Sequence, residues 1–191
     1  MAKLVIDKVE AEAGSVVRVS INIQNNPGIL GAILTLNYDP ALTLLRAEAG
    51  GAWSTLNLTP PRTLTNSCNF VWDGLNNDYS NGSILILTFQ LPDDADVGTV
   101  YDISASYTYG NIINEDMENV TLGIENGSIE VFKIMGDAND DGIVDVADVI
   151  TLRRYLAGGY DITIDESAAD MNGDGIITIV DVTLLRRLLL I

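Results

Sequence analysis

The 191-residue chain contains no histidine and only one cysteine, Cys68. The absence of histidine removes the commonest general base and the imidazole ligand of most zinc sites. Hydrolases that activate a serine or cysteine with a histidine are therefore excluded. A single cysteine cannot form an intrachain disulfide, so the disulfide framework of small secreted domains is excluded as well.

Basic residues and long apolar segments are also scarce. Ten Lys and Arg stand against 27 Asp and Glu, which gives a formal net charge of −17. Such a chain repels nucleic acid, and the apolar stretch near its end, residues 188–191, is far shorter than the roughly 20 residues of a membrane span. We therefore expect no nucleic-acid partner and no membrane insertion. Residues 1–8 lack the apolar core of a signal peptide, so the leader of a secreted form would lie outside this sequence.

Apolar and polar residues alternate with a period of two from Val16 to about Phe132. This alternation is typical of strands with one buried face. Asn126-Gly127 is the strongest short hairpin signal in the region. Eight or nine short strands without a helix predict an all-β jelly-roll sandwich of about nine strands in residues 1–133.

Residues 134–191 contain an internal repeat instead. The segment 137–148 recurs at 170–181, and each copy leads into an amphipathic helix that carries Leu-Arg-Arg. Gly158-Gly159 is expected to end the first helix. The pattern predicts a small all-α module of two EF-hand-like loop–helix repeats.

Each repeat has oxygen-bearing residues where a 12-residue calcium loop has its ligands, at positions 1, 3, 5, 7, 9 and 12, with Gly at position 6. The expected ligands are Asp137, Asn139, Asp141, Ile143, Asp145 and Asp148 in the first loop, and Asp170, Asn172, Asp174, Ile176, Thr178 and Asp181 in the second. A single such cluster is usually a solvated turn, but two copies in register predict two calcium ions. We expect the ions to hold this small module folded, and the second site, with the uncharged Thr178, to bind more weakly.

The duplicated Asp-x-Asn-x-Asp-Gly loop with its Leu-Arg-Arg helix closely resembles the type I dockerin module of cellulosomal proteins, over residues 136–191. In that family the two repeats are related by a pseudo-twofold axis and dock onto the cohesin of a scaffoldin. The resemblance implies these contact residues: Val146, Ala147, Arg153, Arg154, Ile179, Val180, Arg186 and Arg187. The near-identity of the repeats implies that either could lead the contact, which would give two binding modes.

The sandwich segment looks like a cohesin from about Val5 to Phe132. The resemblance is carried by Ala13-Gly14, Asn26-Pro27-Gly28-Ile29, Leu36-Asn37-Tyr38-Asp39, Gly82-Ser83-Ile84-Leu85 and Gly127-Ser128-Ile129-Glu130-Val131. It implies a nine-stranded jelly roll that binds, on one sheet face, the dockerin of an enzyme or of another scaffold component. Because the chain would then carry both halves of a complementary pair, head-to-tail self-association is a further expectation.

Together the two resemblances imply a noncatalytic adaptor, a small scaffoldin, in an extracellular or cell-surface polysaccharide-degrading complex of an anaerobic bacterium. One alternative is a carbohydrate-binding sandwich, with Trp53, Trp72 and Tyr79 as the aromatic platform, that the dockerin anchors to a scaffold. Another alternative makes the sandwich a structural support for the dockerin, which only residues 133–135 separate from it.

Overall fold

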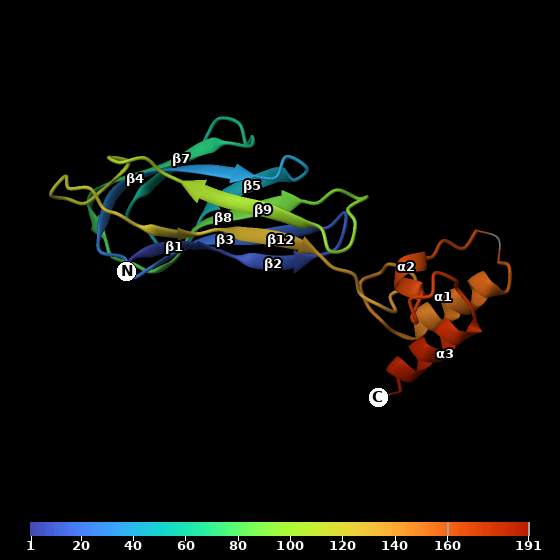
Figure 1. Ribbon diagram of the computed structural model, residues 1–191. Coiled ribbons are helices and arrows are strands. Elements are labelled where there is room, and N and C mark those ends of the chain that lie inside the picture. Colours follow the sequence, from blue (N-terminus) through green and yellow to red (C-terminus); the bar gives the residue numbers. More distant parts are fainter. Residues whose placement is uncertain (160, 191) are drawn as a thin grey trace. The chain divides into compact units, whose positions relative to one another are not determined.

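The computed structural model describes residues 1–159 and 161–190. The chain divides into two compact units, Met1–Phe132 and Lys133–Ile191. The first unit is built of strands and the second of short helices (Figure 1). None of the helices in the described part of the chain is long and apolar enough to cross a membrane.

Two sheets packed face to face form the first unit. One sheet has the strand order β11 (Gly123–Glu125), β1 (Lys3–Ile6), β3 (Val16–Gln24), β8 (Gly82–Gln90) and β5 (Thr43–Ala49). The other has the order β2 (Lys8–Ala11), β12 (Gly127–Val131), β9 (Val100–Ser106), β4 (Ile29–Tyr38), β7 (Cys68–Asp78) and β6 (Asn57–Thr59), and β10 (Ile112–Ile113) pairs with β4. The expected all-β sandwich is confirmed.

The hairpin predicted at Asn126-Gly127 is wrong. The strand before it, β11, pairs with β1 in one sheet, whereas β12 pairs with β2 and β9 in the other. The chain therefore changes sheets at this dipeptide instead of turning back on itself. Gly127 serves the close approach of two backbones, because a Cβ there would overlap the carbonyl oxygen of Asp7. The chain also changes sheets at Asp7, between β1 and β2. Because of these changes, the unit has more than the nine strands expected.

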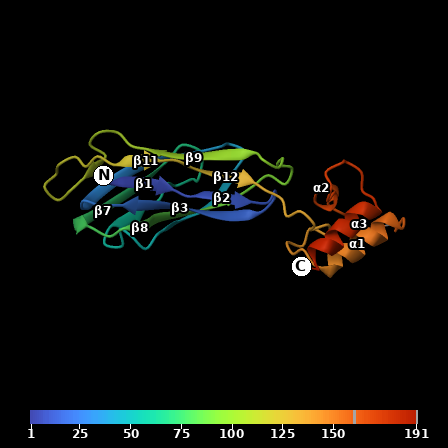
Figure 2. The same cartoon turned by 60° about the horizontal axis from the view of Figure 1, so that its bottom comes forward.

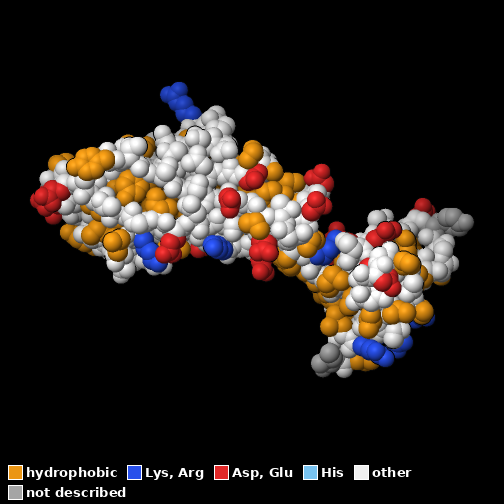
Figure 3. Space-filling view, viewed as in Figure 1, with side chains coloured by type: hydrophobic (Ala, Val, Ile, Leu, Met, Phe, Trp, Pro, Cys, Tyr) orange, Lys and Arg blue, Asp and Glu red, His pale blue; other side chains and the backbone are white. Residues whose placement is uncertain are grey.

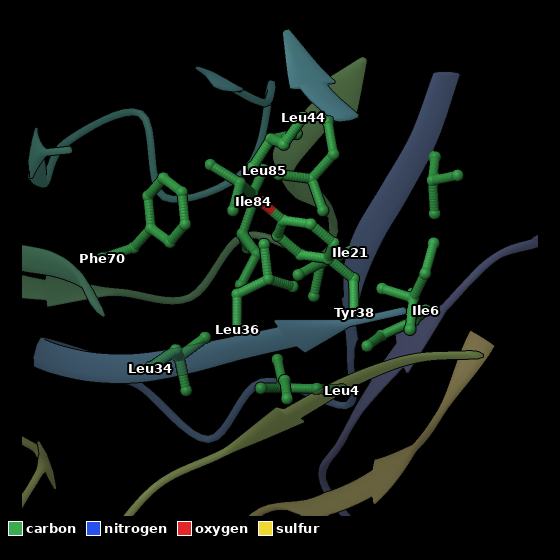
Figure 4. Close-up of a cluster of buried hydrophobic side chains, with 14 of the residues drawn as sticks. Leu4, Ile6, Ile21, Leu34, Leu36, Tyr38, Leu44, Phe70, Ile84 and Leu85 are labelled. Carbon is green, nitrogen blue, oxygen red and sulfur yellow. The ribbon is translucent and has the colours of Figure 1, made fainter. Parts of the chain in front are cut away.

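Alternation along the strands decides which side chains fill the sandwich. On β3, Val19, Ile21 and Ile23 are buried, while the residues between them face outward. Residues such as Leu36, Phe70 and Leu85 meet them from the other strands and point toward one another (Figure 4). Burial of one such side chain contributes roughly 1.5–3 kcal/mol. Because this core is large, we expect the sandwich to fold without a bound ion.

The second unit consists of α1 (Val146–Leu156), α2 (Glu166–Ala169) and α3 (Ile179–Leu188). Helices α1 and α3 lie side by side in both views (Figures 1 and 2). The two long helices confirm the loop–helix repeats, and Gly158, with φ of +76°, follows the end of α1 as expected. The short helix α2 was not predicted. The core is small and comprises Ala138, Val149, Leu152, Ala169, Val182 and Leu185.

Candidate functional site

The first Asp-rich loop is wrapped around the carboxylate of Asp137, which is buried. Its Oδ1 accepts the N–H of Asp141 at 3.1 Å, and its Oδ2 accepts the N–H of Gly142 at 2.8 Å. Gly142 has a φ of +84°, a conformation that side chains disfavour, so the turn requires glycine here. In the second loop Asp170 accepts the N–H groups of Asp174 and Gly175 in the same manner.

The last position of each loop is a fully buried carboxylate. Asp148 accepts the N–H groups of Asn139 at 3.1 Å and Asp145 at 2.7 Å. Its counterpart Asp181 accepts those of Met171 at 3.0 Å and Thr178 at 2.8 Å. These bonds tie the beginning of each loop to the first turn of the helix that follows. No Lys or Arg of residues 1–159 and 161–190 lies within 4.0 Å of either carboxylate.

The other expected ligands lie in the same two loops. The amides of Asn139 and Asn172 donate to Asp141 and Asp174, each at 2.8 Å. The residues at position 9 of the two loops, Asp145 and Thr178, cap α1 and α3 through their side-chain oxygens. Ile143 and Ile176 occupy position 7, where the main-chain carbonyl is the expected ligand. Among the described residues, no group of three or more acidic or thiol side chains lies close enough together to hold a metal ion. Many carboxylate oxygens instead accept N–H groups of their own loop.

The donor set nevertheless fits a hard divalent cation. Every side-chain candidate offers oxygen, which suits calcium and not the softer transition metals. A buried carboxylate without a cationic partner is costly, and each loop ends on such a carboxylate, Asp148 or Asp181. These residues would hold the ion, and the ion would serve to order the loop.

The expected contact residues lie on the surface of α1 and α3. Val146, Ile179 and Val180 are exposed, which rules out core packing for them, and Ala147 is half-buried. Arg153, Arg154, Arg186 and Arg187 are also exposed. No carboxylate in the described part of the chain lies within 4.0 Å of these four guanidinium groups. Basic and hydrophobic side chains meet on this unit in Figure 3.

Lys133 ties the beginning of the helical unit to α2. Its Nζ pairs with the carboxylate of Asp165 and donates to Ser167 Oγ at 2.7 Å. Burial alone would raise the pKa of Asp165, but the bonds from Lys133, from the Ala168 N–H and from Ser167 outweigh it and lower the pKa. No sequence pattern predicted this ion pair, because its partners are 32 positions apart (133 to 165).

Replacing Lys133 with Met should destabilise the helical unit by about 1 kcal/mol at neutral pH and low salt. The change removes the ion pair but retains most of the aliphatic stem. Thermal unfolding with calcium present measures the loss, with Lys133→Arg as the charge-preserving control. Since salt screens a partly exposed pair, the difference should shrink in 1 M salt. An equal loss for the Arg variant would contradict this account.

A polar hollow on the sandwich unit was missed by the sequence analysis. It has a volume of about 440 Å³ and is lined by Asn37, Tyr38, Asp39, Asn66, Ser67, Asp102 and Ser104. Strands β4 and β9 pair side by side and bring Asp39 next to Asp102, whose carbonyl accepts the Asp39 N–H at 3.0 Å. The motif Leu36-Asn37-Tyr38-Asp39 contained part of the site, but no local signal linked it to Asp102.

The aromatic platform expected for the carbohydrate-binding alternative is absent. Trp53 and Trp72 are each 2% exposed and pack edge to face, with ring centroids 5.3 Å apart. Of the three rings only Tyr79 is exposed. Trp72 alternates inward on β7, and the loop after β5 folds Trp53 onto it, so both rings serve the core.

A β-sandwich followed by paired Asp-rich loop–helix repeats defines a protein of two modules. Residues 2–131 match the family model of the cohesin domain, and residues 135–190 match that of the dockerin type I domain. The chain therefore belongs to the cohesin family and also carries a type I dockerin domain. Both are noncatalytic interaction domains of cellulosome-type adaptors, and type I dockerin domains generally bind calcium.

Solved cohesin structures share the fold of the sandwich. The third cohesin of ScaC from Acetivibrio cellulolyticus, solved with the ScaB dockerin, is 24% identical with a TM-score of 0.59, over 70% of this chain and 100% of that one. A type III cohesin of the ScaE scaffoldin from Ruminococcus flavefaciens is 22% identical with a TM-score of 0.62, over 69% and 88%. A non-cellulosomal cohesin from Archaeoglobus fulgidus is 17% identical with a TM-score of 0.61, over 69% and 91%. None of the curated proteins matches the chain.

Proposed function

We propose that this protein is an assembly adaptor whose cohesin receives the dockerin of an enzyme or scaffold component, while its own dockerin docks onto the cohesin of a scaffoldin. The observation that carries the proposal is the presence of both domain types in one chain. Cohesin and dockerin modules bind each other in solved complexes from Clostridium thermocellum and Acetivibrio cellulolyticus. The adaptor would act outside the cell or at its surface, where cellulosome-type proteins are typically found.

The charges of the two modules support this function. On the dockerin, four exposed arginines have no carboxylate partner among the described residues within 4.0 Å. On the cohesin, Asp39 and Asp102 line the polar hollow with no Lys or Arg of the described chain paired to them. Opposite charges on complementary faces speed association and fix orientation. We therefore propose that the hollow receives basic side chains of an incoming dockerin.

Calcium makes the dockerin competent in this proposal. Asp137, Asn139, Asp141, Ile143, Asp145 and Asp148 would hold one ion, and Asp170, Asn172, Asp174, Ile176, Thr178 and Asp181 a second. The first turns of α1 and α3 are bonded to these loops through Asp148 and Asp181. Ordering the loops therefore fixes the helices that carry the docking residues Val146, Ala147, Arg153, Arg154, Ile179, Val180, Arg186 and Arg187. A rigid face loses less entropy on docking.

Calorimetric titration of the whole chain tests the function. One arm uses a panel of type I dockerins and the other a panel of cohesins, each with calcium and with a chelator. We expect a dockerin to saturate the sandwich, and a cohesin to saturate the helical module only with calcium.

The double variant Asp39→Asn with Asp102→Asn should weaken dockerin binding at least tenfold and leave cohesin binding unchanged. The control is Asp116→Asn, which removes an exposed charge elsewhere on the sandwich.

The same titration distinguishes the alternatives. Cohesin binding without dockerin binding would contradict the adaptor and leave carbohydrate binding or structural support for the sandwich. Retardation of the chain by plant polysaccharides in affinity electrophoresis would favour carbohydrate binding.

Self-association of the chain would make its sedimentation coefficient rise with protein concentration. Addition of a chelator should abolish that rise.

A further inference from the structure

The two dockerin repeats differ on their exposed helix faces. Ile150, Arg153 and Arg154 of α1 and its C-cap residue Ala157 line a hollow of about 270 Å³, which we call the α1 hollow. Ile150 is 51% exposed, whereas the neighbouring Val149 and Leu152 of α1 are buried. The hollow thus combines an apolar side chain, two guanidinium groups and the small Ala157, and it leaves room for a side chain of a partner.

The second repeat carries different residues at the equivalent positions, 33 residues later (150 to 183). Thr183 replaces Ile150, and its hydroxyl donates to the Ile179 carbonyl at 2.9 Å, so it is already satisfied within α3. Leu190 replaces Ala157 and is 80% exposed. The arginine pair is retained as Arg186 and Arg187. The exposed helix faces of the two repeats therefore match in charge but differ in shape and polarity.

We propose that the first repeat leads docking, and that the α1 hollow receives an apolar side chain flanked by carboxylates on the partner cohesin. The guanidinium groups of Arg153 and Arg154 have no carboxylate partner among the described residues within 4.0 Å, which leaves both free to meet an acidic surface. Ile150 and Ala157 are then the specificity-determining residues. This inference rests on the proposed docking of the dockerin onto a cohesin.

A half-turn of the dockerin would bring the second repeat to the same partner surface. Leu190 would then project where Ala157 leaves space, and Thr183 would replace the apolar contact of Ile150. Overpacking and the loss of an apolar contact both weaken binding. The two binding modes are therefore unequal, even though the arginines and the calcium loops repeat.

Exchange of these residues in the full chain tests the inference. The variant Ile150→Thr with Ala157→Leu gives the first repeat the surface of the second, and we expect it to bind a cohesin at least tenfold more weakly in calorimetry with calcium. The matched control, Thr183→Ile with Leu190→Ala, should bind within about twofold of the unaltered chain, because the first repeat still leads. Combining all four changes moves the hollow to the second repeat and should restore most of the affinity.

The outcomes separate the inference from the proposed function. If the first exchange costs less than twofold, or the four-change variant stays as weak as the first exchange, the assignment of the hollow is overturned. Failure of the unaltered chain to bind any cohesin would overturn the proposed function, and the inference with it. All four positions are exposed, and an unchanged far-ultraviolet circular dichroism spectrum with calcium would show that each variant folds.

Discussion

Removal of calcium should abolish the helical structure of residues 133–190 and leave the β-sandwich folded. Among the described residues, the core cluster of the helical unit has six buried members, whereas each loop concentrates carboxylates whose mutual repulsion the ion would offset. Calorimetric unfolding with calcium should show two transitions, and a chelator should remove one of them. At a calcium concentration 1,000 times Kd, one ion contributes about 4 kcal/mol.

Matched variants make this prediction specific to the loops. Asp148→Ala removes a buried carboxylate that bonds both ends of the first loop, and it should lower calcium affinity by at least tenfold. Asp140→Asn removes an exposed charge from the same loop at a position that is not an expected ligand, and asparagine tolerates the φ of +59° found there. It should leave the affinity within about threefold. A helical transition that persists unchanged in chelator would contradict the calcium assignment.

The variant Asp78→Ala should destabilise the sandwich by about 3 kcal/mol. Asp78 is 4% exposed, and its carboxylate accepts the N–H groups of Thr55 at 3.2 Å and Ser80 at 2.8 Å, as well as both hydroxyls. It thereby fastens the loop that carries the buried Trp53, whose backbone N–H donates to Ser80 Oγ at 2.9 Å. Alanine would leave these donors without an acceptor, and hydrogen bonds to a charged group contribute about 1.5–3 kcal/mol each.

Chemical denaturation of the sandwich measures this loss of stability. The control is Asp73→Ala, which removes an exposed carboxylate from the same strand. Burial alone would raise the pKa of Asp78, but the bonds from Ser80 and Thr55 outweigh it and lower the pKa. Because this pKa is lowered in the folded state, the ionised Asp78 carboxylate contributes its full stabilisation above the ordinary aspartate pKa of about 3.9. That stabilisation is lost as the pH falls through the lower pKa of the folded state. The difference between Asp78→Asn and the unaltered chain should therefore narrow in acid. A difference that grows in acid would contradict this sign.

Local patterns carried much of the fold and of the calcium site. Alternation identified strands such as Val16–Gln24 because a pleat sends successive side chains to opposite faces. The loops could be recognised because all the expected ligands of one proposed site lie within 12 residues. The helices after them begin at the capping residues Asp145 and Thr178. The exposure of Val146 and Ile179 also agrees with the contact role that the dockerin resemblance implied.

The sequence by itself thus determined the two modules, the periods of their elements and the oxygen-rich loops, since each depends on residues close together in the chain. Tertiary structure alone decided that the chain changes sheets at Asn126 and that Trp53 and Trp72 form core and no sugar platform. It alone brought Asp39 beside Asp102 and Lys133 beside Asp165. These features depend on pairing and burial between distant segments, which the local pattern of a single strand or loop does not encode.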